Sequence, residues 1–327
     1  MAKPRILIVD HFDADAMAWL EAQLDCEVRL SEQLRPRAED LIDVEGLLIR
    51  SRTKVDRSLL DQAKRLRIVV TATSGLEHVD FKECQSREIK IAHCPEANVA
   101  SAAELTILLM LAFVRRLPQT LESMNKNQWR HEGLRGRELR GQNLGLFGLG
   151  RIGQRVARLA QAFEMKVSAC DPYQSDESFD SLKIERLGLS EILVQSDIIS
   201  LHVPLTKETK GLINGQTLGV INPEAVIINA SRGGVVDENE VITALDEGRL
   251  KGAALDVFER EPLIKESRLR ARNETILTPH IGAFTEEAVR AASFEAVKST
   301  ADFFKGGACA NLLPLAEPWF HLSGFDS

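Results

Sequence analysis

The chain has 327 residues, of which 44% are hydrophobic and 27% charged, with a formal net charge of −7. This length is too great for one typical domain and predicts two, and the negative charge excludes a general attraction to nucleic acid or to anionic membrane. The five cysteines are odd in number and lack metal-knuckle spacing, which indicates free thiols in a reducing compartment and no metal site. Neither a signal peptide nor a membrane span is predicted, so we expect a cytoplasmic protein.

The first part of the chain alternates short β-branched runs with amphipathic stretches. Four runs are predicted as buried strands, namely RILIVD (5–10), GLLIRS (46–51), RIVVTAT (67–73) and IKIAHC (89–94). Helical periodicity covers residues 14–24 and 55–66. These β-α units predict a small domain built on a parallel sheet.

A long apolar segment follows, over residues 97–119. Ser101 is predicted to cap a helix there, with Glu104 as its capping-box partner. Because this helix would be apolar on most faces, we expect it to be buried.

A second series of strand patterns occupies the rest of the chain and predicts a larger α/β domain. Its members are NLGLFG (143–148), MKVSACD (165–171), DIISLHVP (197–204), AVIINAS (225–231), GAALDV (252–257) and TILTPH (275–280). A closing helix is predicted over 286–304, with Gly306-Gly307 as its C-cap signal.

The strongest local motif is Gly148-Leu149-Gly150-Arg151-Ile152-Gly153, between a predicted strand and a helical stretch. The glycines would allow a tight turn, a close approach of backbone to pyrophosphate, and packing of the helix on the strand. The helix N-terminus would offer N–H groups to the phosphates. Asp171 ends the next predicted strand, where a carboxylate can bind ribose hydroxyls and repel a 2′-phosphate. The motif therefore predicts binding of NAD rather than NADP.

Three further residues follow later strand patterns: Arg232, Glu261 and His280. In open α/β sheets, ligands bind at the carboxyl ends of the strands. A guanidinium can hold a carboxylate in bidentate fashion, and a histidine can exchange a hydroxyl proton near neutral pH. A carboxylate beside that histidine would orient it and favour its protonated form. The trio predicts oxidation and reduction of a small hydroxy acid at C2.

In their order, these motifs resemble the D-2-hydroxyacid dehydrogenases. The resemblance rests on GLGRIG, HVPLTKETKGLIN, INASRGGVVDE, ALDVFEREP and TPHIGAFT, and extends to Trp129, GRELRGQNLG and NLLP. It implies two doubly wound parallel-sheet domains: a Rossmann NAD-binding domain over 100–287, and a smaller flavodoxin-like substrate domain over 1–99 and 288–327. A homodimer and the D configuration at C2 are implied as well.

The resemblance also implies roles for individual residues. Arg232, Glu261 and His280 correspond to the family's catalytic set. The positions that line the cofactor pockets correspond to His202, Pro204, Ala230, Arg232, Asp256 and His280. The turn Ser74-Gly75-Leu76 resembles the family's backbone loop over the substrate carboxylate, which Arg232 would also bind.

The substrate domain carries two partial resemblances. RSRTKV is similar to 3-phosphoglycerate dehydrogenases, and TATSGLEHVD to erythronate-4-phosphate dehydrogenases. Both imply a phosphorylated 2-hydroxy or 2-keto acid, with Arg50, Arg52 and Lys54 as candidate phosphate contacts; 3-phosphoglycerate is the preferred substrate. Alternatives are erythronate-4-phosphate or a hydroxypyruvate/glyoxylate-type substrate, and an NADH-sensing corepressor-like protein as a different functional class.

Overall fold

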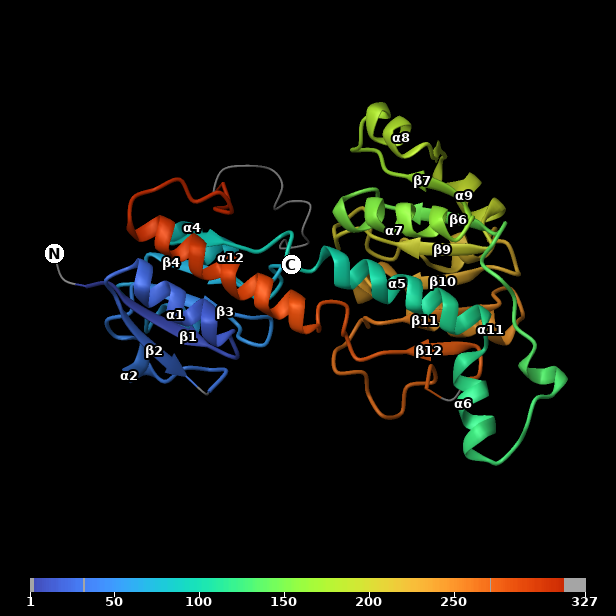
Figure 1. Cartoon of the computed structure of the whole chain (residues 1–327), viewed down its shortest axis with the longest axis horizontal. Coiled ribbons are helices and arrows are strands. Elements are labelled where there is room, and N and C mark those ends of the chain that lie inside the picture. The colour runs from blue at the N-terminus through green and yellow to red at the C-terminus, as the bar shows by residue number, and fades with distance from the viewer. Residues whose placement is uncertain (1–2, 32, 271, 315–327) are drawn as a thin grey trace. The chain divides into compact units, whose positions relative to one another are not determined.

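The computed structural model describes residues 3–31, 33–270 and 272–314, and the chain divides into two compact units (Figure 1). Unit 1 combines the described residues of 3–98 with those of 284–314, and unit 2 consists of those in 99–283. The end of the predicted substrate domain, 315–327, lies outside the described residues.

Unit 1 is built on a five-stranded parallel sheet. Its strands are β1 (Arg5–Val9), β2 (Glu27–Ser31), β3 (Gly46–Ile49), β4 (Ile68–Thr71) and β5 (Lys90–Ala92). The spatial order is β2-β1-β3-β4-β5, with every neighbouring pair parallel. This is the flavodoxin-like order of a doubly wound sheet, so the predicted fold class is confirmed for this unit.

Strand β2 was not among the four predicted strands. It lies at the edge of the sheet, and none of its residues is fully buried. Charged side chains help to hold it: Arg29 forms ion pairs with Glu27 and Asp43, and Arg5 bonds to Glu27. An edge strand that faces water lacks the apolar run by which the buried strands are identified.

Helices cover both faces of this sheet: α1 (Ala14–Gln23) and α12 (Glu286–Phe304) on one face, and α2 (Ala38–Leu41), α3 (Arg57–Leu60) and α4 (Phe81–Ser86) on the other. Successive strand residues alternate between the two cores, so Ile6 packs with α1 and α12 while Leu7 packs with the α2–α4 layer. Helix α12 has the predicted bounds, and Gly306, at φ +72°, follows its end. The helix predicted over 55–66 is wrong in length, since α3 covers only Arg57–Leu60. One helical turn and the turns that follow it are enough to bring a few apolar side chains into the core.

Unit 2 has a seven-stranded parallel sheet. Its strands are β6 (Asn143–Phe147), β7 (Lys166–Cys170), β8 (Glu185–Arg186), β9 (Ile198–Leu201), β10 (Val226–Asn229), β11 (Gly252–Leu255) and β12 (Thr275–Leu277). Their order is β12-β11-β10-β9-β6-β7-β8. The connection reverses between β6 and β9, which is the Rossmann arrangement with its switch point at the end of β6. The predicted fold class is confirmed here too; the two-residue edge strand β8 was not predicted.

The helices of unit 2 also form two layers: α5 (Val99–Val114), α7 (Arg151–Ala162) and α8 (Asp176–Leu182) on one face, and α9 (Leu189–Gln195), α10 (Gly215–Leu218) and α11 (Glu238–Asp246) on the other. Helix α6 (Leu117–Asn125) follows α5. Much of α5 is buried, as expected. The predicted cap is wrong, because α5 begins at Val99 and Ser101 lies within its first turn. Among the described helices, none is both long and apolar enough to cross a bilayer.

Candidate active site

A glycine-rich loop joins β6 to α7. Gly148 has φ +91°, and a Cβ there would lie 2.4 Å from the carbonyl oxygen of His202. A Cβ on Gly153 would lie 2.2 Å from the Gly148 carbonyl oxygen, so neither position accepts a side chain. In contrast, a Cβ on Gly150 would meet no atom of the described chain within 4 Å, and no side chain caps α7 behind it. Open space before a helix N-terminus fits the pyrophosphate of a dinucleotide.

Asp171 follows β7 and holds this loop in place. Its carboxylate accepts hydrogen bonds from the N–H groups of Leu149, at 2.7 Å, and Tyr173, at 2.9 Å. Each oxygen of an ionised carboxylate has a second lone pair, so both can still accept from ribose hydroxyls. Arg151 and Ile152, also predicted to contact the cofactor, form the first turn of α7.

Three more predicted cofactor contacts follow strands β9 and β10. His202 donates its backbone N–H to the Phe147 carbonyl at 2.7 Å, and its Nε2 lies 2.9 Å from the Ser200 hydroxyl oxygen. Burial lowers the pKa of His202 to about 4, so its ring is neutral near pH 7. Pro204 and Ala230 lie in the loops that follow β9 and β10. His202 is therefore an uncharged residue that packs against the glycine loop.

The predicted catalytic residues come from three neighbouring strands. Arg232 follows β10, Glu261 follows β11, and His280 follows β12, and these strands are adjacent in the sheet. Parallel strands bring their carboxyl ends to the same edge. Residues far apart in sequence are thereby gathered at one place in unit 2.

Glu261 and His280 are in direct contact. His280 Nδ1 lies 2.6 Å from Glu261 Oε2, and the Phe258 N–H donates to Glu261 Oε1 at 3.1 Å. The hydrogen bond and negative charge of Glu261 raise the pKa of His280 above its ordinary value, although burial and Arg232 oppose this. Burial acts to raise the pKa of Glu261, but the bond and charge of His280 outweigh it, so that pKa is lowered. The pair therefore favours an imidazolium beside a carboxylate.

Asp256, at the end of β11, fixes the backbone on both sides of His280. Its carboxylate is fully buried and accepts from the Thr278 hydroxyl at 2.7 Å and from the N–H groups of Ile281 and Gly282 at 2.8 and 2.9 Å. Its carbonyl accepts from the His280 N–H at 2.8 Å. These bonds hold His280 at φ +53°, an uncommon conformation for a residue with a side chain. Contact of Asp256 with the cofactor stays a prediction.

The loop of Arg232 is pressed against the loop that leads to Glu261. A Cβ on Gly233 would lie 1.8 Å from the Phe258 carbonyl oxygen, so only glycine allows this approach. Glu238 and Glu259 join the same two loops, since the backbone N–H of each donates to the other's carboxylate, at 3.1 and 2.6 Å. The positions of Arg232 and Glu261 are therefore fixed relative to each other.

In unit 1, the three basic candidates have different surroundings. Arg52 bonds through Nε to Asp10 Oδ2 at 3.0 Å and makes a second bond to the same carboxylate, which is 4% exposed. Arg50 has a buried Nη1 with no hydrogen-bond partner among the described residues, and burial lowers its pKa. Lys54 is exposed. Because Arg52 is already paired with Asp10, Arg50 is the best candidate of the three to bind an anion.

Ser74, Gly75 and Leu76 form a turn after β4, next in the sheet to β3, which Arg50 follows. The loops after these two strands are joined by their backbones. The Val55 N–H donates to the His78 carbonyl, and the Asp80 N–H to the Val55 carbonyl, both at 2.8 Å.

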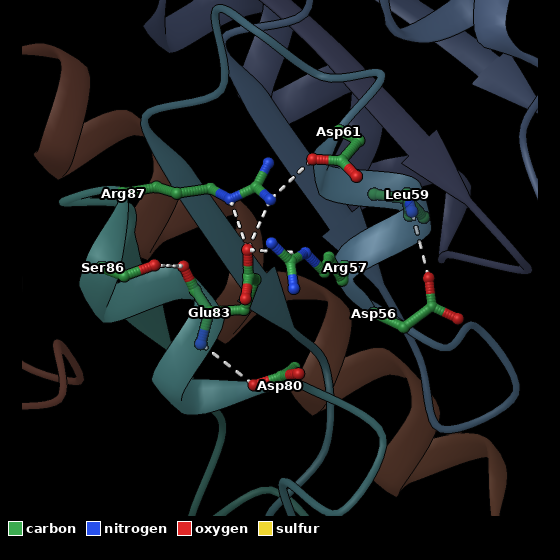
Figure 2. A network of polar contacts seen from close by, with 8 residues as sticks. All are labelled: Asp56, Arg57, Leu59, Asp61, Asp80, Glu83, Ser86 and Arg87. Atoms are coloured by element: carbon green, nitrogen blue, oxygen red, sulfur yellow. Dashed lines mark hydrogen bonds and ion pairs between the residues drawn. The ribbon is translucent and has the colours of Figure 1, made fainter.

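A surface network strengthens this junction (Figure 2). Asp56 and Asp80 cap α3 and α4, each accepting from a helix N–H at 3.0 Å. Figure 2 shows the Glu83 carboxylate between the guanidinium groups of Arg57 and Arg87, and Arg87 also bonds to Asp61 at 2.8 Å. The two helices are thus tied together beside the loops of interest.

Sequence reasoning missed Asp10, which has φ +77° and pairs with Arg52. Its position directly after the first strand was the available signal. It also missed Thr71, Thr73 and His93, which contact the 74–76 turn or each other. In the described part of the chain, no cluster of histidine, cysteine and acidic side chains is arranged to hold a metal ion.

Comparison with known proteins agrees with this geometry. Residues 107–282 match the model of the D-isomer specific 2-hydroxyacid dehydrogenase NAD-binding domain. The chain is 36% identical to the hydroxypyruvate reductase of Thermotoga maritima, over 91% of this chain and 97% of that protein. It is similar to the structure of Aquifex aeolicus D-lactate dehydrogenase with NAD and lactic acid, with a TM-score of 0.81 at 30% identity over 92% of this chain and 96% of that one.

A third relative is longer. The D-3-phosphoglycerate dehydrogenase of Methanocaldococcus jannaschii is 36% identical over 94% of this chain, but the match covers 59% of that protein. The chain spans little more than half the length of the phosphoglycerate dehydrogenases that it matches.

Proposed function

Because the chain belongs to the D-isomer specific 2-hydroxyacid dehydrogenase family, we propose that it is an NAD-dependent dehydrogenase acting at C2 of a D-2-hydroxy acid. The observation that carries this proposal is the 2.6 Å contact between His280 and Glu261 on strands adjacent to that of Arg232. An acid–base group, its partner carboxylate and a guanidinium are what this reaction requires of a protein.

The cofactor would be held by the glycine loop and by Asp171. The open space at Gly150 and the uncapped start of α7 suit a pyrophosphate, and the free lone pairs of Asp171 suit ribose hydroxyls. The bound nicotinamide would supply the hydride donor or acceptor for the substrate. Asp171 would repel a second phosphate on the ribose, which favours NAD over NADP.

His280 transfers the hydroxyl proton. Its Nδ1 is held by Glu261, which leaves Nε2 for the substrate oxygen. Protonated His280 donates to the carbonyl oxygen during reduction, and neutral His280 accepts the hydroxyl proton during oxidation. Because Glu261 raises the pKa of His280, the acid form persists to higher pH than that of an isolated histidine. Arg232 binds the substrate carboxylate.

Unit 1 contributes contacts to the anionic groups of the substrate. The N–H groups of the Ser74–Leu76 turn would bind the carboxylate, and Arg50 a phosphate. The buried Nη1 of Arg50 supports this assignment, because a buried guanidinium nitrogen without a partner costs free energy that an anion would recover. We therefore propose 3-phosphoglycerate and 3-phosphohydroxypyruvate as the substrate pair, and keep erythronate-4-phosphate as an alternative.

A plain 2-keto acid is the second candidate substrate. The T. maritima relative is a hydroxypyruvate reductase, and this chain covers nearly all of its length. Hydroxypyruvate and glyoxylate therefore belong in the same assay.

The test is a panel of glyoxylate, pyruvate, hydroxypyruvate and 3-phosphohydroxypyruvate with NADH, followed at the nicotinamide absorbance. We expect turnover with at least one of them and the highest kcat/KM with the phosphorylated acid. Tight NADH binding without turnover of any member would overturn the proposal in favour of a corepressor-like protein. A higher kcat/KM for hydroxypyruvate would instead reassign the substrate.

We also infer a homodimer. Helices α5 and α6 and the segment after them expose large apolar side chains, namely Leu108, Leu117, Leu121, Met124 and Trp129. Figure 1 shows α6 standing away from the sheet of unit 2. Exposed apolar patches of this kind mark association surfaces, and a second copy is the partner that the family resemblance implies.

Light scattering after size exclusion tests this inference. Wild type should have twice the 36.3 kDa chain mass, and Leu121→Glu with Met124→Glu should be monomeric. Ile264→Glu is the control, since Ile264 is also exposed and apolar but lies elsewhere in unit 2. A monomeric wild type would refute the dimer.

We propose that the protein is located in the cytoplasm. All five cysteines are free thiols, and free thiols persist in a reducing compartment.

A further inference from the structure

The turn Ser74-Gly75-Leu76 rests on a chain of polar side chains within unit 1. Thr73 Oγ1 lies 2.6 Å from the Gly75 carbonyl oxygen and 2.7 Å from Thr71 Oγ1. Thr71 Oγ1 in turn lies 2.8 Å from His78 Nε2. Thr71 is fully buried, so its hydroxyl depends on these partners.

The protons of this chain can be assigned one by one. A carbonyl oxygen only accepts, so the single Thr73 proton must lie toward Gly75. The Thr71 proton must then lie toward Thr73, because Thr73 has no proton left to donate. Thr71 therefore accepts from His78, and His78 Nε2 must carry a hydrogen. The relay runs in one direction, from His78 through Thr71 and Thr73 to the Gly75 carbonyl.

A second histidine holds the preceding carbonyl. His93 Nδ1 lies 3.1 Å from the carbonyl oxygen of Ser74, so Nδ1 must donate. In a trans peptide the C=O and the N–H of the same unit point in opposite directions. With the carbonyls of Ser74 and Gly75 held against His93 and Thr73, the N–H groups of Gly75 and Leu76 face away from those partners. In the described residues, no acceptor of the chain contacts either N–H.

We propose that His78, Thr71, Thr73 and His93 are positioning residues, which orient the Gly75 and Leu76 N–H groups to bind the carboxylate of a 2-keto acid. This inference rests on the proposed function and deepens it. Successive backbone N–H groups in a turn can form an anion-binding nest. Both carbonyls must be restrained for the nest to persist, because rotation of either peptide plane would replace a donor by an acceptor.

The main test removes the Thr73 hydroxyl at constant shape. Thr73→Val and Thr73→Ser are compared in the full-length protein with NADH, and the probe is oxamate, an unreactive 2-keto acid analogue, measured by calorimetry. Loss of one hydrogen bond predicts about a tenfold weaker oxamate affinity for Thr73→Val, while Thr73→Ser stays within about twofold of wild type. KM for the best keto acid should rise in parallel, with kcat and NADH affinity nearly unchanged.

The histidines have matched variants of their own. Asparagine can present an amide nitrogen near the place of Nδ1, and glutamine near that of Nε2. His93→Asn and His78→Gln should therefore retain oxamate binding better than His93→Leu and His78→Leu. A merely structural role would lower Tm and NADH affinity together with oxamate affinity, in leucine and amide variants alike.

A third readout does not depend on activity. Nitrogen NMR of histidine-labelled protein should find a proton on Nε2 of His78 and on Nδ1 of His93. An unprotonated nitrogen at either place, or equal oxamate affinities for Thr73→Val and Thr73→Ser, would overturn the inference and leave the dehydrogenase assignment intact. If the wild type neither binds oxamate nor reduces any keto acid, the proposed function is refuted and the nest has no carboxylate ligand. The NMR result would still show whether the hydrogen-bond relay from His78 to Gly75 is present.

Discussion

In the proposed function, the two units bind an anionic substrate by different means. Unit 2 brings ionised groups together: His280 beside Glu261, with Arg232 on the adjacent strand and the buried Asp256 behind them. Unit 1 presents backbone N–H groups that hydroxyls and imidazoles orient. The difference follows from the task, because proton transfer needs a group that changes charge, whereas holding a carboxylate needs only donors in fixed positions.

The acid–base site of unit 2 and the 74–76 turn of unit 1 also differ in backbone strain. His280 at φ +53° costs roughly 1–2 kcal/mol, and four hydrogen bonds to Asp256 surround it: three to the carboxylate and one to the carbonyl. The 74–76 turn contains no residue at positive φ. Of these two places, only the proposed proton-transfer residue has a positive φ. Five substitutions test this contrast, from the largest expected effect to the smallest.

His280→Ala should have the greatest effect. Loss of a positioned acid–base group should lower kcat by about 10²- to 10⁴-fold, while the NADH dissociation constant changes little. Stopped-flow reduction of the best keto acid is the measurement. A near-normal kcat in an assay limited by chemistry would end the acid–base assignment and the contrast between the units.

Gly233→Ala should come next. Its Cβ would meet the Phe258 carbonyl, which must shift and move the loops of Arg232 and Glu261 apart. A displacement near 1 Å predicts about a 10²-fold loss in kcat/KM. Gly188→Ala is the matched control, since its Cβ meets only the end of the Glu191 side chain. Equal activity of the two variants would show that the contact between the loops does not position the site.

Arg50→Ala examines the arginine of unit 1 whose Nη1 atom is buried. KM for 3-phosphohydroxypyruvate should rise by roughly 30-fold, the worth of a charged hydrogen bond, with a much smaller change for hydroxypyruvate. Lys54→Ala is the control, because Lys54 is exposed. If KM rises equally for both acids, Arg50 does not bind the substrate phosphate.

Asp171→Ala addresses the charge beside the glycine loop. The preference for NADH over NADPH in kcat/KM should narrow by about tenfold, since one carboxylate that repels a phosphate is gone. The variant also loses bonds to two backbone N–H groups, so Tm is followed in parallel. A wild type that uses both cofactors equally would contradict the role of Asp171.

Glu261→Gln should give the smallest change, seen chiefly as a shift in pH dependence. Glu261 raises the pKa of His280, so removal of its charge lowers that pKa. Reduction, which needs protonated His280, should then decline at lower pH than in wild type. Oxidation, which needs the neutral form, should extend to lower pH. Superimposable pH–rate profiles in both directions would show that the pair is not coupled.

The sequence predicted those parts that depend on local pattern. The buried strands, helix α12 and the glycine loop each have a periodicity or a spacing of their own. The residues that follow strands, such as Arg232 and His280, could be grouped because parallel strands end at one edge. Strand β2 escaped detection because none of its residues is fully buried and charged side chains pair along it.

Other features depend on contacts that no local pattern encodes. The pairing of Asp10 with Arg52 joins the ends of two strands, and it decides which of two similar arginines is left for a ligand. The relay beneath Gly75 depends on where the turn places its carbonyls. Likewise, the cap of α5 was misplaced because Val99 and Ala100 already belong to the helix.

Helix α12 has a consequence for how the chain is made. Its buried residues Ala292, Ala296 and Val297 share a core with Ile6 and Ile8 of the first strand. On a ribosome, which delivers the N-terminal end first, the sheet of residues 3–98 has one apolar face covered by α1 alone until the last helix is made. Unit 2 is continuous in sequence and can complete its core earlier. The N-terminal segment is thus made first, yet its core is completed only when the last helix has been made.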